Sequence, residues 1–185
     1  MVGKEYKEVL DSLKRVSAKG IKIIYLEGNH DFSMGSFFTD TLKADVYPDY
    51  AELTLDNKRA YLAHGDAVDM SLGYRLWRGL LRSSFFRIIV RLIPPKQGWN
   101  IARRLSGKSR QYSVLKADVE ERLKRFAQKK ISEGFDIVIL GHSHSAGVHE
   151  VNAGNRKGVY GNPGSFSKGG SHLVFEGGRF RARRG

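Results

Sequence analysis

The sequence predicts an α/β protein in which mixed sheets present polar side chains at the ends of their strands. Helix-like and strand-like segments alternate along the first half of the chain. Several apolar runs also end in glycine and histidine. The functional residues of α/β proteins usually lie at the carboxyl ends of the strands. The apolar runs that end in glycine and histidine therefore indicate where the functional site should lie.

The first elements are a helix and a strand. Residues 4–19 have apolar side chains at helical spacing and end at Gly20, which predicts an amphipathic helix with a glycine cap. Residues 21–26 predict a buried strand that leads into Gly28. A helix that feeds a strand is half of a βαβ unit, and the preceding strand is missing. We therefore expect an N-terminally truncated domain.

The remaining regular elements lead to further histidines. A predicted hairpin ends at His64, and a predicted helix and strand end at Gly141. An antiparallel run of strands should follow, with Gly177-Gly178 as a tight turn. These segments are the hairpin strands 50–55 and 59–63 with a turn at 56–58, the helix 117–132, the strand 136–140, and the strands 147–151, 157–160, 172–176 and 179–183.

Composition limits the class of protein. The 185 residues, 41% of them hydrophobic, suit one globular domain over residues 1–185. The absence of cysteine excludes disulfides, thiolate metal sites and a cysteine nucleophile. No secretory signal or apolar run long enough for a membrane span is present. A cytoplasmic location is compatible with these features.

The net charge of +13 is concentrated in residues 70–117, which we expect to be a basic, amphipathic helical insertion. No Asp or Glu occurs from Ser71 to Ala117. Such a segment suits anions: nucleic acid, anionic lipid headgroups or a polyanionic substrate. The alternative is a helical hairpin with an apolar side in the core and a solvated arginine side. Its cations are Arg75, Arg78, Arg82, Arg87, Arg91, Lys96, Arg103, Arg104, Lys108, Arg110 and Lys116.

Four short polar motifs carry the candidate chemistry, and they hold four of the six histidines. Imidazole and amide groups without thiolates suit Mn²⁺, Fe²⁺ or Zn²⁺, with Asn29, His64, His142 and His144 as candidate ligands. His30 is a candidate general acid or charge stabiliser. His149 and His172 are expected to be structural. The motifs are Gly28-Asn29-His30-Asp31, His64-Gly65-Asp66, Gly141-His142-Ser143-His144 and Asn162-Pro163-Gly164-Ser165, the last being either a loop near the metals or an ordinary turn.

In this order, the first three motifs resemble those of the calcineurin-like metallophosphoesterase family, and the fourth recurs in bacterial members. The resemblance implies an α/β/β/α sandwich and a phosphoesterase with two divalent metals, Mn²⁺ being our choice. Asn29, His64 and His142 would bind one metal and His144 the other. His30 would be the catalytic histidine, with Asp31 orienting it. The metals would activate water and stabilise developing charge.

The chain departs from the family pattern at its start. The family's Asp-x-His and Gly-Asp-x-x-Asp motifs, which supply metal ligands and the bridging carboxylate, have no counterpart here. A truncated gene model is the expectation we favour, and a fragment or a degenerate paralogue are the alternatives.

The insertion narrows the expected substrate. It resembles the helical lid of the UDP-2,3-diacylglucosamine diphosphatases of lipid A synthesis, which cleave their substrate to lipid X and UMP. An anionic, lipid-linked nucleotide would have its phosphates held by arginines and its acyl chains covered by apolar side chains. The expected location is peripheral, on the anionic inner face of the inner membrane. The candidate substrate-binding residues are Arg75, Trp77, Arg78, Arg82, Arg103 and Arg104.

Two rival functions remain open from the sequence. The basic segment could grip the backbone of a nucleotide or nucleic-acid substrate, and binding would then weaken steeply with salt. Alternatively, the chain could be an inactive fragment or paralogue that keeps only a surface for anionic membranes.

Overall fold

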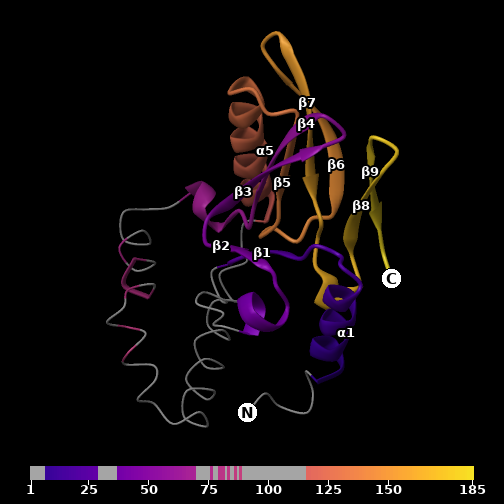
Figure 1. Ribbon diagram of the computed structural model, residues 1–185. Helices are drawn as coiled ribbons and strands as arrows, with labels where there is room; N and C mark the ends of the chain where they lie inside the picture. Colours follow the sequence, from indigo (N-terminus) through magenta and orange to yellow (C-terminus); the bar gives the residue numbers. More distant parts are fainter. Residues whose placement is uncertain are drawn as a thin grey trace.

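The computed structural model of the chain (Figure 1) describes residues 7–28, 37–69, 76, 79–81, 83, 86, 88 and 116–185. Its class is the expected mixed α/β. Among the described residues, the long α-helices are α1 (Lys7–Ala18) and α5 (Lys116–Ser132), and short helical turns lie at Phe37–Thr41, Asp66–Asp69 and Phe166–Lys168. The strands are β1 (Ile24–Leu26), β2 (Asp45–Tyr47), β3 (Tyr50–Leu55), β4 (Lys58–Ala63), β5 (Ile137–Leu140), β6 (Gly147–Ala153), β7 (Arg156–Asn162), β8 (His172–Glu176) and β9 (Arg179–Arg183).

A five-stranded mixed sheet with the order β3-β4-β5-β7-β6 forms the centre of the described structure. Strands β4, β5 and β7 are parallel to one another, whereas β3 and β6 are the antiparallel outer strands. The predicted antiparallel run is therefore divided. Only β6 and β7 join this sheet, and β8 and β9 form a separate hairpin.

The hairpin of β3 and β4 has a shorter turn than we predicted. Asp56 and Asn57 adopt φ angles of +46° and +62°, and Lys58 already pairs with Leu55. Positive φ at both central residues is typical of a type I′ turn, whose twist matches that of the strands it joins. Aspartate and asparagine tolerate this left-handed conformation, so the turn needs no glycine.

Helix α5 covers one face of the central sheet (Figure 1). Its apolar side chains Leu123, Ala127 and Ile131 are each no more than 1% exposed, and they pack with Val138 and Leu140 of β5. Val119 and Phe126 flank this core. The prediction that residues 117–132 form a helix is confirmed, and the 3.6-residue period places these apolar positions on one side of it.

The hairpin of β8 and β9 lies on the other face of the sheet. A Cβ added at Gly161 of β7 would lie 2.8 Å from Ile139 and 2.9 Å from Leu173 of β8, so glycine allows the two layers to approach closely. Strand β9 also contacts β6. Helix α5, the central sheet and this hairpin supply three of the four layers expected of an α/β/β/α sandwich.

The predicted strand 21–26 was wrong in its length and burial. Strand β1 contains only Ile24–Leu26, pairs in parallel with β2 and is half-buried. Ile21 is 54% exposed, and Lys22 forms an ion pair of 2.8 Å with Asp45. Among the described residues, β1 and β2 form a sheet separate from the central one. The apolar alternation alone did not reveal β2 as a partner.

Helix α1 confirms the predicted first helix and its glycine cap. Gly20 adopts φ +74°, its N–H donates to the carbonyl of Ser17, and Ile21 N–H donates to that of Val16. This pair of bonds is a Schellman motif, which satisfies carbonyls at the end of the helix. Ser17 Oγ donates to the carbonyl of Leu42 at 2.7 Å, which attaches α1 to the segment before β2.

Most of the predicted insertion at residues 70–117 lies outside the described residues. The positions 76, 79–81, 86 and 88 are helical, as expected. In the described part of the chain, no helix has both the length and the apolar character required to cross a membrane.

Candidate functional site

The carboxyl ends of the three parallel strands bring three of the sequence motifs together. His64 follows β4, Gly141-His142-Ser143-His144 follows β5, and Asn162 ends β7. The register places Ala63 beside Leu140, and Gly141 N–H continues the ladder by donating to the carbonyl of His64 at 3.0 Å. Parallel pairing therefore places the motifs at one edge of the sheet, where α/β proteins bind ligands.

The rings of His64 and His142 lie side by side at this edge. Their centroids are 5.4 Å apart, and their planes meet at 70°. Two imidazoles that share a metal, each at about 2.1 Å from it, have centroids about 5 Å apart. The pair therefore fits a shared divalent metal in donor type and in spacing.

Glycines allow the loops after β4 and β5 to approach each other. Gly65 adopts φ +101°, and a Cβ there would lie 3.2 Å from Leu123 and 3.4 Å from the carbonyl oxygen of Gly141. A Cβ at Gly141 would lie 3.3 Å from the carbonyl oxygen of His64. A larger residue at either position would push apart the loops that carry His64 and His142.

His144 lies on the same loop, but its side chain is exposed. His142 and His144 both have left-handed backbones, with φ of +70° and +58°. The side chains of the described residues do not form any group of three or more histidine or carboxylate groups arranged to hold a metal. The described part of the chain thus contains a pair of metal-type ligands and a third candidate nearby.

A buried polar network lies beneath this loop. Asn162 is fully buried, and its Nδ2 donates to Ser143 Oγ at 2.7 Å. Ser143 Oγ donates to Glu120 Oε2 at 2.5 Å, joining the loop to helix α5. Asn162 Oδ1 accepts the N–H of Gly164 at 2.9 Å, which orients the amide. The fourth motif therefore contacts the third and is more than an ordinary turn.

Tyr160 of β7 closes the network from below. Its side chain is fully buried, and its hydroxyl lies 3.4 Å from Asn162 Nδ2. Burial raises the pKa of Tyr160 above its usual value, and the nearby carboxylate of Glu120 acts in the same direction. The phenol is therefore neutral throughout the physiological range, so it adds no charge beneath the histidines.

Several predicted site residues lie outside the described residues. These are the candidate metal ligand Asn29, the candidate catalytic residues His30 and Asp31, and the candidate substrate-binding residues Arg75, Trp77, Arg78, Arg82, Arg103 and Arg104. Of the two histidines expected to be structural, His149 stacks on Tyr160 with centroids 5.9 Å apart, and His172 Nδ1 lies 2.8 Å from the carbonyl oxygen of Gly170.

Sequence reasoning missed Glu120 and Ser143. A signal for Glu120 was present, because it occupies the same helical stripe as Leu123 and Ala127, at spacings of three and seven residues. A carboxylate on the inward face of an amphipathic helix requires a buried partner. That partner, Ser143, could not be identified without knowing which strand the helix covers.

Curated proteins named UDP-2,3-diacylglucosamine hydrolase resemble the chain over most of its length. The protein from Haemophilus influenzae (strain PittGG) is 29% identical over 146 residues, covering 77% of this chain and 62% of the relative. The protein from Pseudomonas putida (strain F1) is 27% identical over the same length, covering 77% of this chain and 61% of the relative. The chain thus spans about three-fifths of the length of these relatives.

No model of a known protein family matches the chain. A solved structure described as a novel archaeal phosphodiesterase matches 95% of the chain and 76% of its own length, with 15% identity and a TM-score of 0.49. The resemblance indicated by the sequence motifs is thus confirmed by relatives that are named as hydrolases of UDP-2,3-diacylglucosamine.

Proposed function

We propose that this chain is a metal-dependent phosphoesterase that hydrolyses the diphosphate bond of UDP-2,3-diacylglucosamine, giving lipid X and UMP. The observation that carries the proposal is the position of His64 and His142 at the carboxyl ends of β4 and β5, where their ring centroids are 5.4 Å apart. The names of the curated relatives support the substrate. Residues 1–185 would form one domain, with residues 70–117 as a lid-like insertion.

In this proposal, His64 and His142 hold one metal together with Asn29, and His144 holds the second. Bound divalent metals, Mn²⁺ in our proposal, would activate water and stabilise charge on the phosphoryl group. His30 would lie beside the phosphate, where an imidazole can donate a proton or stabilise negative charge, and Asp31 would orient it.

The insertion supports an amphiphilic substrate. Three of its described side chains are large, apolar and exposed: Leu76 at 76%, Leu80 at 47% and Ile88 at 57%. Exposed apolar side chains in a segment without acidic residues suit an anionic lipid better than a polar polyanion. We infer that the arginines at 75, 78, 82, 103 and 104 hold phosphates, that Trp77 covers acyl chain, and that the protein associates peripherally with the inner face of the inner membrane.

Substrate comparison tests this function. The purified chain with Mn²⁺ is assayed for release of UMP from UDP-2,3-diacylglucosamine and from non-acylated UDP-N-acetylglucosamine. We expect cleavage of the acylated substrate, loss of cleavage after chelation with EDTA, and recovery on adding Mn²⁺. Equal rates on both substrates would contradict the lipid assignment and favour a nucleotide phosphodiesterase.

Histidine variants test the proposed metal site separately. His64→Ala and His142→Ala should each lower the amount of Mn²⁺ bound per chain, measured by elemental analysis after gel filtration. His149→Ala is the matched control, because His149 is an exposed histidine that stacks on Tyr160 of β7. Absence of bound metal in the wild-type chain would reject the metal site in this chain.

A further inference from the structure

We propose that Glu120 is a positioning residue that fixes the conformation of the loop Gly141-His142-Ser143-His144 through a directional hydrogen-bond relay. The inference concerns the histidine loop itself. Its link to metal binding rests on the proposed function.

The loop has a backbone that its sequence does not favour. Ser143 N–H donates to the carbonyl of Gly141 at 2.9 Å, which makes His142 the centre of a γ-turn with φ +70°. This form of the γ-turn is rare and strained. His144 is also left-handed, at φ +58°. Two non-glycine residues keep such conformations only where the surrounding structure enforces them.

Hydrogen bonds to the side chain of Ser143, which lies between the two histidines, hold the loop in this conformation. Gly164 N–H donates to Asn162 Oδ1, so the Nδ2 of this amide points the other way and donates to Ser143 Oγ at 2.7 Å. Ser143 Oγ already accepts this bond, and it donates its own proton to Glu120 Oε2 at 2.5 Å. Ser143 Oγ thus accepts one short bond and donates another, which fixes the direction of the relay from Gly164 to the helix carboxylate. Asn162 Nδ2 also makes a longer bond of 3.4 Å to the carbonyl of Gly141.

Stability alone gives a poor account of a carboxylate at this place. Its other oxygen, Oε1, is buried without a hydrogen-bond partner among the described residues, although the Tyr160 hydroxyl interacts with the same carboxylate. A buried acceptor without a partner is unfavourable for folding. Buried polar groups that lack a hydrogen-bond partner are found mainly at functional sites. The same carboxylate also receives a longer bond of 3.4 Å from Asn162 Nδ2, so Oε2 is the acceptor at which the relay ends.

We test the proposal first on the metal-free chain by NMR. The Cα and Cβ chemical shifts of His142 and His144 report their left-handed backbones, and ¹⁵N relaxation reports the order of the loop. Glu120→Ala should move these shifts toward random-coil values and raise loop mobility. Glu120→Gln should restore them, because the amide oxygen can accept from Ser143. Unchanged shifts in Glu120→Ala would overturn the proposal.

Controls separate positioning from general stability. Glu121→Ala is the matched variant, because Glu121 lies one residue along the same helix, is exposed, and forms an ion pair of 3.5 Å with Lys124. It should leave the loop unchanged. Ser143→Ala removes the relay from the other side and serves if Glu120→Ala fails to fold. The double variant Glu120→Ala/Ser143→Ala should change the loop's chemical shifts and mobility no more than Ser143→Ala alone, because both substitutions interrupt the same relay. Additive changes in the double variant would contradict the proposal.

Metal affinity gives the functional readout, measured by the visible absorption of bound Co²⁺. Residues that orient metal ligands typically change affinity about 10–100-fold when mutated, and we expect a loss in this range for Glu120→Ala and recovery in Glu120→Gln. Wild-type affinity in Glu120→Ala would overturn the positioning role. If the wild-type chain binds no Co²⁺, the proposed metal site fails, and the NMR comparison still decides the role of Glu120.

Discussion

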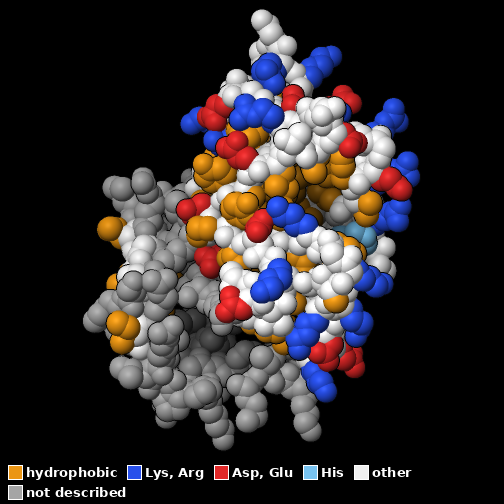
Figure 2. Space-filling model, viewed as in Figure 1, with side chains coloured by type: hydrophobic (Ala, Val, Ile, Leu, Met, Phe, Trp, Pro, Cys, Tyr) orange, Lys and Arg blue, Asp and Glu red, His pale blue; other side chains and the backbone are white. Residues whose placement is uncertain are grey.

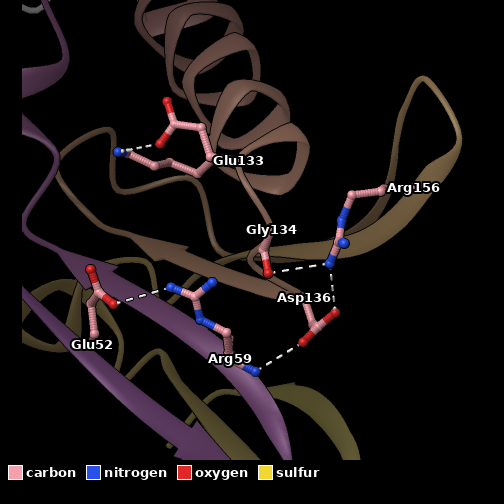
Figure 3. Close-up of polar contacts among 7 residues, drawn as sticks. Glu52, Arg59, Glu133, Gly134, Asp136 and Arg156 are labelled. Carbon is pink, nitrogen blue, oxygen red and sulfur yellow. Dashed lines mark hydrogen bonds and ion pairs between the residues drawn. The ribbon is translucent and has the colours of Figure 1, made fainter.

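The carboxylate of Asp136 accepts the backbone N–H of Arg59 through Oδ2 at 2.9 Å (Figure 3). The backbone of Asp136 also exchanges bonds with its neighbours on both sides, since its N–H donates to the carbonyl of Arg59 and its carbonyl accepts the N–H of Val159. One residue thus joins β4, β5 and β7 at the end of the sheet opposite His64 and His142. These three hydrogen bonds of Asp136 help to fix the strand register that places the two histidines side by side.

Asp136→Ala should lower the free energy of unfolding by about 1–3 kcal/mol, because it removes a charged acceptor from the backbone of β4. Urea unfolding measures this change. Arg156→Ala is the control, since Arg156 makes an exposed ion pair of 3.3 Å with the same carboxylate (Figure 3). Exposed pairs contribute about 0–1 kcal/mol. Equal losses in the two variants would show that the backbone bond is not the dominant contribution.

Gly164→Ala should be strongly destabilising because two effects act together. Gly164 adopts φ +77°, and a Cβ there would lie 2.7 Å from the Cβ of Ala146 and 2.9 Å from that of Ser171. Left-handed strain and overpacking together should lower the free energy of unfolding by roughly 2–4 kcal/mol.

Gly20→Ala isolates the strain. Gly20 has nearly the same φ, +74°, and a Cβ there would meet nothing within 4 Å. The free energy of unfolding of Gly20→Ala should fall by about 1–2 kcal/mol. The difference between the two variants in urea unfolding gives the contribution of the clash at Gly164. No difference between them would mean that the loop around Ala146 moves to accept the methyl group.

Tyr61 should make the fold sensitive to alkaline pH. It is 7% exposed and stacks on Tyr50 with centroids 5.0 Å apart. Burial, followed by the nearby Tyr50 and Asp49, raises its pKa to about 12 from 10.0. The neutral phenol is favoured in the folded chain, so its contribution to stability is complete below pH 10 and is lost as pH rises toward 12.

Tyr61→Phe should therefore flatten the decline of unfolding free energy between pH 10 and 12, measured by urea titrations at several pH values. Part of the decline should remain, because burial also raises the pKa of Tyr160. Tyr160→Phe gives the complementary comparison. An unchanged pH profile in Tyr61→Phe would contradict the assignment of the effect to this phenol.

The arginines of β9 should protect the chain from aggregation. Arg179, Arg181 and Arg183 alternate along the strand and are exposed, and in the described structure β9 is hydrogen-bonded to β8 alone. Strands β8 and β9 lie at the right of Figure 1, and lysine and arginine side chains line the right-hand side of the same view in Figure 2. Positive charge on an edge strand opposes pairing with another chain. Replacing all three by threonine should increase light scattering at physiological salt, whereas replacement by lysine should not.

Hairpins and amphipathic helices were predictable because their signals are local. Residues 117–132 carry their inward face in their spacing, and Gly177-Gly178 forms the expected turn with φ of +57° and +73°. The strand at 21–26 was less predictable. Its partner β2 is three residues long, and neither its sequence nor its length distinguishes it from a loop.

The sequence by itself determined the mixed α/β class, the elements that end in histidine and the resemblance to a family of phosphoesterases. These properties depend on residue types and on short-range periodicity. Only the tertiary structure decided that β4, β5 and β7 are parallel neighbours, and therefore that His64 meets His142 while Asn162 supports the loop between them. It also assigned Ser143 as the partner of Glu120. Pairing between strands and packing of a helix join residues far apart in the chain, and such contacts depend on the whole arrangement rather than on any local pattern.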